Sequence, residues 1–194
     1  MSKEKTPVTA AVRELRAGKV EFTDHLYEYE DKGGTAVSAR ELGVPEHAVV
    51  KTLVMEDDDG NPLIVLMHGD LKVSTGGLAR IVGVKTIAPC NPEAANRHSG
   101  YVVGGTSPFG TRKKMPVYME ETILGLPKIY INGGKRGYLV GIAPQEAMRI
   151  LSPKLVKVGI KGIANGREYR ECREYRASQR REQIPDNADD GPTV

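Results

Sequence analysis

Two apolar runs separated by an acidic turn constrain the fold of this 194-residue chain more than any other feature. The runs cover residues 49–55 and 63–67, and the segment 57–62 between them contains a run of aspartates, Gly60 and Pro62. Apolar runs on both sides of a glycine-containing turn predict a β-hairpin, here with a turn longer than the tight two-residue type. The chain is therefore expected to contain a sheet.

Apolar spacing and turn residues predict the other elements. Thr6 and Pro7 have the pattern of an N-cap and first helical position, and Asn91 and Pro92 repeat that pattern. The strands outnumber the helices and several are joined by short turns, which predicts a mixed α/β (α+β) fold without strict βαβ alternation. Helices are expected over 7–17, 35–42, 74–82, 92–98 and 144–151, and strands over 20–29, 84–88, 116–119, 129–132 and 138–142 in addition to the hairpin.

The length fits one domain, which we assign to residues 1–158, followed by a charged C-terminal extension over 159–194 that is partly helical or disordered. The net charge is +3, from 28 basic and 25 acidic residues. Basic and acidic residues cancel from position 159 onward, so the positive excess lies entirely in the domain. We expect this weak excess to matter only where it is concentrated.

Several classes of protein are excluded by composition and motif. No apolar stretch is long enough to span a membrane, and the N-terminus has no signal-peptide pattern. Cys90 and Cys172 lie far apart, which favours a reducing cytoplasm over a disulfide framework, and Cys90 is interpreted as inert. The four histidines show no zinc spacing and are interpreted as surface or packed residues, and neither G-x-S-x-G nor H-E-x-x-H occurs. We therefore expect no metal, no cofactor and no membrane association.

Lys51 interrupts the first apolar run of the hairpin. Both faces of that strand are otherwise apolar, so the lysine has no obvious solvent side. It is either an edge-strand lysine that extends to water, or a lysine at the mouth of a pocket. A pocket lysine would hold a phosphate or polarise a carbonyl group.

Two glycine-rich segments are further candidates for a site. Paired glycines in 104–110 permit close approach of a ligand to the backbone, and N–H groups in such a loop can stabilise an oxyanion. Segment 132–137 combines glycines with Lys135 and Arg136, which suits a phosphate. Both segments are equally natural as ordinary turns, and neither matches a P-loop.

Basic residues are concentrated at Lys135 and Arg136 and at a second cluster over 112–114. Such small clusters fit contact with a polyanion, although runs of charge are commonly solvated. An extended nucleic-acid groove is not indicated.

Taken in order, three segments resemble the YbaK family of trans-editing deacylases, which are related to the editing domain of bacterial prolyl-tRNA synthetases. They are Val-Val-Lys-Thr-Leu at 49–53, Arg-His-Ser-Gly-Tyr-Val-Val-Gly-Gly-Thr-Ser-Pro-Phe-Gly at 97–110, and Ile-Asn-Gly-Gly-Lys-Arg-Gly at 131–137. The resemblance covers residues 6–158. It implies a mixed, largely antiparallel sheet curled into a partial barrel, with helices around it.

The resemblance also implies a site. Lys51 falls on the family's key lysine, and 104–108 match its G-x-x-x-P loop. Asn132 and Leu139 stand where Ser and Asp are usual, which leaves the amino-acid specificity open. The implied catalytic residues are Lys51, Gly104 and Gly105; the implied substrate-binding residues are Tyr27, Thr106, Ser107, Pro108, Asn132, Gly133 and Gly134; and the implied tRNA-binding residues are Lys135, Arg136, Arg112, Lys113 and Lys114.

The function implied by the resemblance is removal of a mischarged amino acid from tRNA, most typically cysteine from the proline tRNA, with alanine or another small residue as further candidates. An aminoacyl ester is already activated, so positioning and oxyanion stabilisation suffice. The expected partners are mischarged aminoacyl-tRNA and prolyl-tRNA synthetase. The alternatives are a non-catalytic module that binds the tRNA acceptor end or a synthetase, and a hydrolase of another small activated ester.

Overall fold

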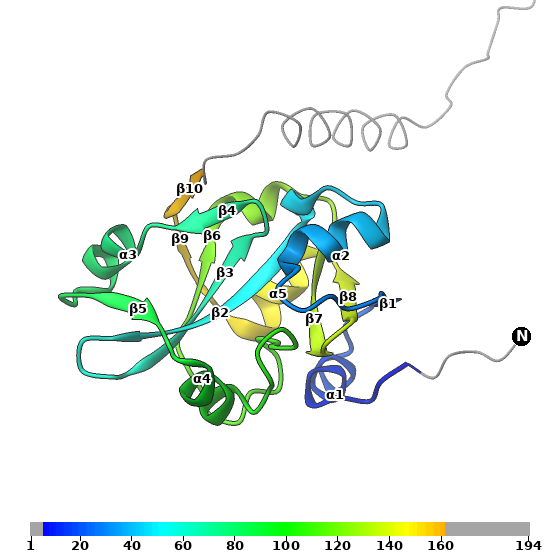
Figure 1. The fold of residues 1–194 in the computed structure, drawn as a ribbon, viewed down its shortest axis with the longest axis horizontal. Helices are drawn as coiled ribbons and strands as arrows, with labels where there is room; N and C mark the ends of the chain where they lie inside the picture. Colours follow the sequence, from blue (N-terminus) through cyan, green and yellow to red (C-terminus); the bar gives the residue numbers. More distant parts are fainter. Residues whose placement is uncertain (1–5, 162–194) are drawn as a thin grey trace, which may run out of the picture.

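The computed structural model describes residues 6–161, which form one mixed sheet with helices around it and a second, two-stranded sheet (Figure 1). Figure 1 shows β2 and β3 crossing the centre, with α3 at one end and α1, α2 and β1 towards the other. The helices are α1 (Ala10–Ala17), α2 (Gly34–Leu42), α3 (Thr75–Val82), α4 (Pro92–Ser99) and α5 (Pro144–Leu151), with short 3-10 turns η1 (Glu46–Ala48) and η2 (Glu121–Gly125). The strands are β1 (Thr23–Leu26), β2 (Val49–Asp57), β3 (Pro62–His68), β4 (Leu71–Val73), β5 (Ile87–Pro89), β6 (Val117–Glu120), β7 (Ile129–Lys135), β8 (Tyr138–Ile142), β9 (Lys154–Val156) and β10 (Gly159–Lys161).

The main sheet has the order β1-β8-β7-β2-β3-β6-β9, and β5 pairs with β2 off this path. The pairs β2–β7, β3–β6 and β6–β9 are parallel, and the other pairs in this sheet are antiparallel. This confirms the predicted mixed α/β class. The sheet is not closed into a barrel, because β1 and β9 remain its two edges.

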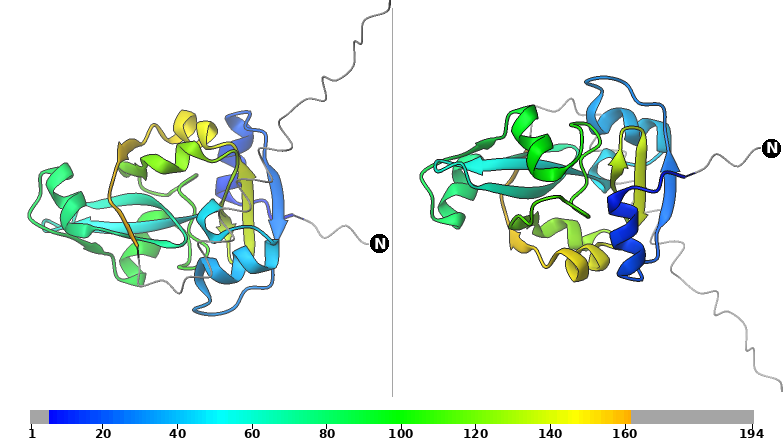
Figure 2. Two further views of the ribbon diagram at one scale, coloured as in Figure 1. Left: turned by 90° about the horizontal axis from the view of Figure 1, so that it is seen from above. Right: turned by 90° about the horizontal axis from the view of Figure 1, so that it is seen from below.

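The predicted hairpin is confirmed as β2 and β3, which pair from Val50 opposite His68 to Glu56 opposite Pro62. Every residue of β3 is buried, which explains its continuous apolar sequence. Figure 2 shows the hairpin extending away from the rest of the sheet, with α3 beside its far end.

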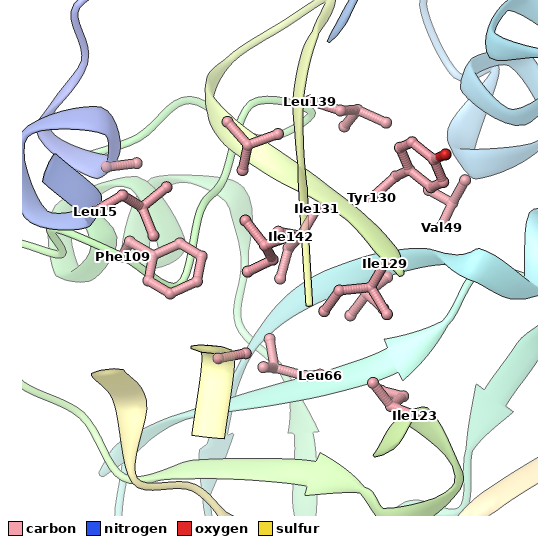
Figure 3. Close-up of a cluster of buried hydrophobic side chains, with 14 of the residues drawn as sticks. Leu15, Val49, Leu66, Phe109, Ile123, Ile129, Tyr130, Ile131, Leu139 and Ile142 are labelled. Atoms are coloured by element: carbon pink, nitrogen blue, oxygen red, sulfur yellow. The ribbon is translucent and has the colours of Figure 1, made fainter. Parts of the chain in front are cut away.

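The larger apolar core lies between the sheet and the helices around it. Figure 3 shows Leu15 of α1 beside Phe109, and Ile129 and Ile131 of β7 near Leu66 of β3. Each of these five side chains is at most 1% exposed. This core fixes β7 and the loop containing Phe109 relative to β2, and these elements carry the glycine-rich segments.

The second edge of β2 is only partly covered. Strand β7 pairs with it at Val49 and Val50, and β5 pairs with it at 55–57. Within the described residues, the stretch 51–54 therefore has a strand partner on its β3 side alone. This gap in the sheet positions the candidate site.

Several predicted boundaries were wrong for identifiable reasons. Helix α1 begins after Thr9, whose Oγ1 accepts a hydrogen bond from Val12 N–H at 3.1 Å, and not after Thr6. The strands expected over 20–29 and 84–88 are shorter than predicted. Gly133 and Gly134 form a bulge within β7 and not the start of a turn, because Asn132 pairs with Leu139 and Lys135 with Tyr138.

Three short strands, β4, β9 and β10, were not predicted, since three residues carry no periodicity to recognise. Strand β10 lies within the segment assigned to the C-terminal extension and pairs with β4. The helical or disordered character predicted for that extension concerns residues outside the described range. Over residues 6–161, no helix has the length and apolar character that crossing a membrane requires.

We expect Leu66→Ala to destabilise the fold by about 2–5 kcal/mol, because Leu66 is completely buried in the central strand β3 and its removal leaves a cavity. Urea unfolding followed by circular dichroism measures this loss. Leu155→Ala is the matched control: Leu155 is 40% exposed on the edge strand β9, so its loss should be below about 1 kcal/mol. Equal losses in the two variants would contradict the assignment of β3 to the core.

Candidate active site

A cavity of about 600 Å³ lies along the partly uncovered edge of β2. Segment 49–54 of β2 forms its floor, and its walls come from 27–38, the loop 103–106, and strands β7 and β8. This volume is in the range of small-molecule sites. The polar side chains that line it belong to Tyr27, Tyr29, Asp31, Lys32, Thr35, Ser38, Lys51, Thr52, Cys90, Thr106, Asn132 and Arg136.

Lys51 lies on the floor of the cavity and is half-buried. Its Nζ donates a hydrogen bond to the carbonyl oxygen of Gly69 at 2.9 Å. Burial lowers the pKa of Lys51, and the carboxylates of Glu46 and Asp70 oppose this lowering. Lys51 therefore lines the cavity while its ammonium is held by the Gly69 carbonyl.

Thr52, beside Lys51, carries unused hydrogen-bonding capacity. Its Oγ1 is buried and, over residues 6–161, is the one buried side-chain nitrogen or oxygen atom that has no hydrogen-bond partner. Alternate residues of an antiparallel strand direct their N–H and C=O groups to the same side. Val54 O accepts from Cys90 N–H at 3.1 Å on the partly uncovered edge, so the backbone groups of Thr52 face that edge too.

The glycine loop is held over the cavity by three side chains. Asn96 Oδ1 accepts a hydrogen bond from Val103 N–H at 3.0 Å, and Arg136 Nε donates to Val103 O at 3.0 Å. Asn132 Nδ2 donates to Gly104 O at 3.3 Å. The loop is therefore tied to α4, to β7 and to the turn between β7 and β8.

Gly104 requires glycine for two reasons. Its φ is +90°, a left-handed conformation, and a Cβ there would lie 2.7 Å from the Tyr29 hydroxyl. The next residue, Gly105, uses its N–H within the loop, donating to Val102 O at 2.8 Å. Thr106 follows and lines the cavity.

The far end of the same loop is anchored in the core. Ser107 and Phe109 are completely buried, and Ser107 Oγ accepts a hydrogen bond from Phe109 N–H at 3.3 Å. The Tyr101 hydroxyl donates to Phe109 O at 2.5 Å, and Gly110 N–H donates to the carboxylate of Glu14. The buried end therefore fixes the exposed end at the cavity.

Arg136 makes two contacts inside the site. Besides its bond to Val103, its guanidinium lies 5.1 Å from the centroid of the Tyr29 ring, the arrangement of a cation–π contact. With Lys32 and Lys51 it gives the cavity three cations, against the single carboxylate of Asp31. The electrostatics of the lining favour an anionic ligand.

The structure brings together only part of the predicted site. Tyr27, Lys51, Gly104, Thr106, Asn132 and Arg136 line the cavity, as does Leu139. The remaining predicted residues lie outside the lining: Ser107, Pro108, Gly105 and Gly133 are buried, Gly134 is partly buried, and Lys135, Arg112, Lys113 and Lys114 are exposed. Thr52, Tyr29 and Lys32 were not predicted, although Thr52 stands next to Lys51 in the first motif.

Cys90 lines the cavity but is poorly suited to act as a nucleophile. Burial raises the pKa of its thiol to about 11, and the neighbouring Glu56 carboxylate, to which Cys90 Sγ donates a hydrogen bond at 3.5 Å, contributes. The thiol therefore stays protonated at neutral pH.

One group in the described part of the chain has the composition of a metal site: His47, His68 and Asp70, with donor atoms within 4.8 Å of one another. The two imidazole rings, however, stack with centroids 3.7 Å apart and planes 10° apart. Nitrogen lone pairs lie in the ring plane, so two parallel stacked rings cannot direct them at one ion. As folded, the group is a hydrogen-bonded cluster.

Comparison with known proteins identifies the family of this chain. The family described as "Aminoacyl-tRNA editing domain" matches residues 30–150, and the chain belongs to this family. The recognition of a YbaK-like editing domain is thereby confirmed.

Two curated relatives and one solved structure show similarity to this chain. EbsC of Enterococcus faecalis, a proposed Cys-tRNA(Pro)/Cys-tRNA(Cys) deacylase, is 26% identical over 163 residues, which are 83% of this chain and 99% of EbsC. The proline–tRNA ligase of Nitratidesulfovibrio vulgaris is 30% identical over 84 residues, 43% of this chain and 14% of the ligase. The crystal structure of a proposed trans-editing enzyme for prolyl-tRNA synthetase has the same fold, with a TM-score of 0.68 and 20% identity over 79% of this chain and 99% of that one.

We expect Arg136→Lys to loosen the glycine loop, because lysine cannot reproduce the planar contact with Tyr29 together with the Nε bond to Val103. Amide hydrogen exchange should rise in 102–106 and stay unchanged in β3. Lys135→Arg, at the exposed neighbouring position, is the control and should leave exchange of the loop unaltered. Unchanged loop exchange in Arg136→Lys would show that this side chain does not restrain it.

We expect Cys90 to react slowly with iodoacetamide at pH 8, since a pKa of about 11 leaves about one thiol in a thousand ionised there. The rate should rise as pH increases towards 11. Glu56→Gln should accelerate alkylation by removing the negative charge beside the thiol. A Cys172→Ser background confines the mass-spectrometric readout to Cys90, and a rate equal to that of a free thiol would refute the raised pKa.

Proposed function

We propose that this chain is a free-standing deacylase that removes cysteine from mischarged tRNA(Pro). The observation that carries the proposal is that Lys51 and the Gly104 loop line one cavity along the partly uncovered edge of β2. Membership of the aminoacyl-tRNA editing family and the similarity to EbsC support it. Its working partners are then mischarged aminoacyl-tRNA and prolyl-tRNA synthetase, in the cytoplasm.

In this proposal Lys51 and Arg136 hold the negatively charged end of the tRNA, whose terminal phosphate is attracted by the cations of the lining. The exposed residues Arg112, Lys113, Lys114 and Lys135 extend that attraction to phosphates of the acceptor stem. Thr52, which also lines the cavity, is the proposed contact of the aminoacyl group on the floor.

The proposed reaction needs no nucleophile from the protein. The sulfur of the bound cysteinyl group attacks its own ester carbonyl, the carbonyl carbon–ribose oxygen bond breaks, and the ribose oxygen takes up the thiol proton, which leaves a thiolactone and a free tRNA end. With other amino acids, a water molecule replaces the sulfur and the product is the free acid. The Thr106 N–H, at the cavity wall, is the proposed donor to the oxyanion in both cases, since that of Gly105 is engaged.

Asn132 and Leu139 favour a second candidate function. Both line the cavity where the related editing domains usually carry Ser and Asp, and Leu139 is only 4% exposed, so its apolar side chain is a fixed part of the wall. A module that binds the acceptor end without turnover would tolerate this change. Salt-sensitive tRNA binding without deacylation across a panel of charged tRNAs would establish this alternative.

Lys51→Ala should lower the deacylation rate of Cys-tRNA(Pro) at least about ten-fold, equivalent to about 1.4 kcal/mol in the barrier. The reason is the loss of the ammonium on the cavity floor. Release of labelled cysteine under single-turnover conditions measures the rate. Lys85→Ala removes the same charge at an exposed position outside the cavity lining and should retain full activity. A wild-type rate in a folded Lys51→Ala variant would exclude the role of Lys51.

A further inference from the structure

A cluster of three side chains surrounds the turn that binds Lys51, and the proposed deacylation does not use it. His47 lies in η1 directly before β2, His68 ends β3, and Asp70 follows after Gly69. The carbonyl oxygen of Gly69 accepts the hydrogen bond of Lys51 Nζ at 2.9 Å. The cluster thus lies on both sides of the atom that positions the lysine.

His47 forms hydrogen bonds with both residues that flank Gly69, namely His68 and Asp70. Its Nδ1 lies 2.9 Å from each carboxylate oxygen of Asp70, and because a carboxylate only accepts, Nδ1 is the donor. On the other side, His68 Nδ1 donates to the His47 carbonyl oxygen at 2.6 Å, and the two rings are stacked. The turn is therefore held to η1 from its two ends.

The backbone of Gly69 is closely packed against neighbouring elements. Its N–H donates to Val49 O at 2.7 Å. A Cβ at this position would lie 2.7 Å from both the Glu46 carbonyl oxygen and Thr35 Oγ1. The backbone at Gly69 is packed directly against η1 and α2, so a displacement of η1 moves the carbonyl that holds Lys51.

The cluster is also fixed on its inner side. His68 is completely buried, and its Nε2 lies 2.8 Å from Thr122 Oγ1 in η2. Glu120, next to η2, is 3% exposed and accepts hydrogen bonds from the N–H groups of Val158 and Gly159 at 2.8 and 2.7 Å. The polar chain behind the turn is satisfied inside the protein.

The charges that face Lys51 are the carboxylates of Glu46 and Asp70 and the ammonium of Lys72. Burial raises the pKa of Asp70, whereas its hydrogen bond to His47 and the charges of His47 and His68 lower it. The lowering effects are larger together, so the pKa of Asp70 is below its ordinary value. Asp70 is therefore ionised at neutral pH and favours the protonated form of Lys51.

We infer that His47 and Asp70 are positioning residues for Lys51: together they fix the Gly69 carbonyl that accepts the hydrogen bond of the lysine, and Asp70 places a carboxylate near its ammonium. The inference rests on the proposed function only in giving Lys51 a role in deacylation. The hydrogen bonds that hold the Gly69 turn to η1 do not depend on that role.

The first test does not depend on activity. In protein labelled with ¹³C-lysine, the Lys51 resonance is assigned by its loss in Lys51→Arg and titrated with pH. Asp70→Asn, which keeps the shape of the side chain, should lower the pKa of Lys51. Asp59→Asn removes the same charge from the exposed turn of the β2–β3 hairpin and should leave that pKa unchanged. An unaltered Lys51 titration in Asp70→Asn would overturn the inference.

The second test is a double-mutant cycle on the deacylation rate. Asp70→Ala should lower kcat/KM on the order of ten-fold, because displaced catalytic groups lose rate steeply. In a Lys51→Ala background the same change should cost almost nothing further, since Asp70 acts through Lys51. His47→Asn, whose amide can replace the Nδ1–H donor, should recover most of what His47→Ala loses.

If the losses of kcat/KM in Asp70→Ala and Lys51→Ala were additive, or if His47→Asn recovered no activity, the cluster would not act through Lys51. Thermal melts of every variant measure its effect on overall stability separately. A wild-type protein that deacylates none of the charged tRNAs would overturn the proposed function instead. The NMR titration would then still decide the positioning role.

Discussion

The pairing of β2 is the constraint on which the rest of the structure depends. One edge is hydrogen-bonded to β3 from Val50 to Glu56, which places this pair in the interior of the sheet order. The other edge is shared between β7 and β5, and neither reaches 51–54. A sheet normally completes such an edge, because unpaired backbone groups are costly to bury. Here the gap becomes the floor of the cavity.

The walls around that gap come from segments that lie far apart in the chain. The segment 27–38, the glycine loop and the β7–β8 turn line the cavity from different parts of the chain. Phe109 anchors the glycine loop in the core, while Asn132 and Arg136 hold its exposed end. The glycine loop is therefore positioned by these side-chain hydrogen bonds at one end and by the core at the other.

The sequence predicted the long elements and the motifs, because each carries its own periodicity or turn chemistry. The hairpin over 49–67, helix α4 behind its Asn91 cap and strand β8 needed no tertiary information. What could not be predicted depends on pairing between distant segments. The bulge at Gly133 and Gly134 is defined only by the register against β8, and the three-residue strands exist only because a partner is present.

The same distinction holds for the site. Lys51 and Gly104 were recognisable within their motifs, but Arg136 was expected to contact tRNA and also serves as a bridge to Val103. The relation of His47, His68 and Asp70 was invisible because residues 23 positions apart meet only through the β2–β3 pairing. Geometry created by the fold, and not residue type, decided these cases.

The solitary hydroxyl of Thr52 has a consequence for the energetics of the protein as a whole. A buried polar group without a partner costs about 1–3 kcal/mol, and Thr52 Oγ1 has no partner among the protein groups around it. The floor of the cavity is thus a place where the protein gives up stability, in contrast to the fully bonded polar groups behind the Gly69 turn.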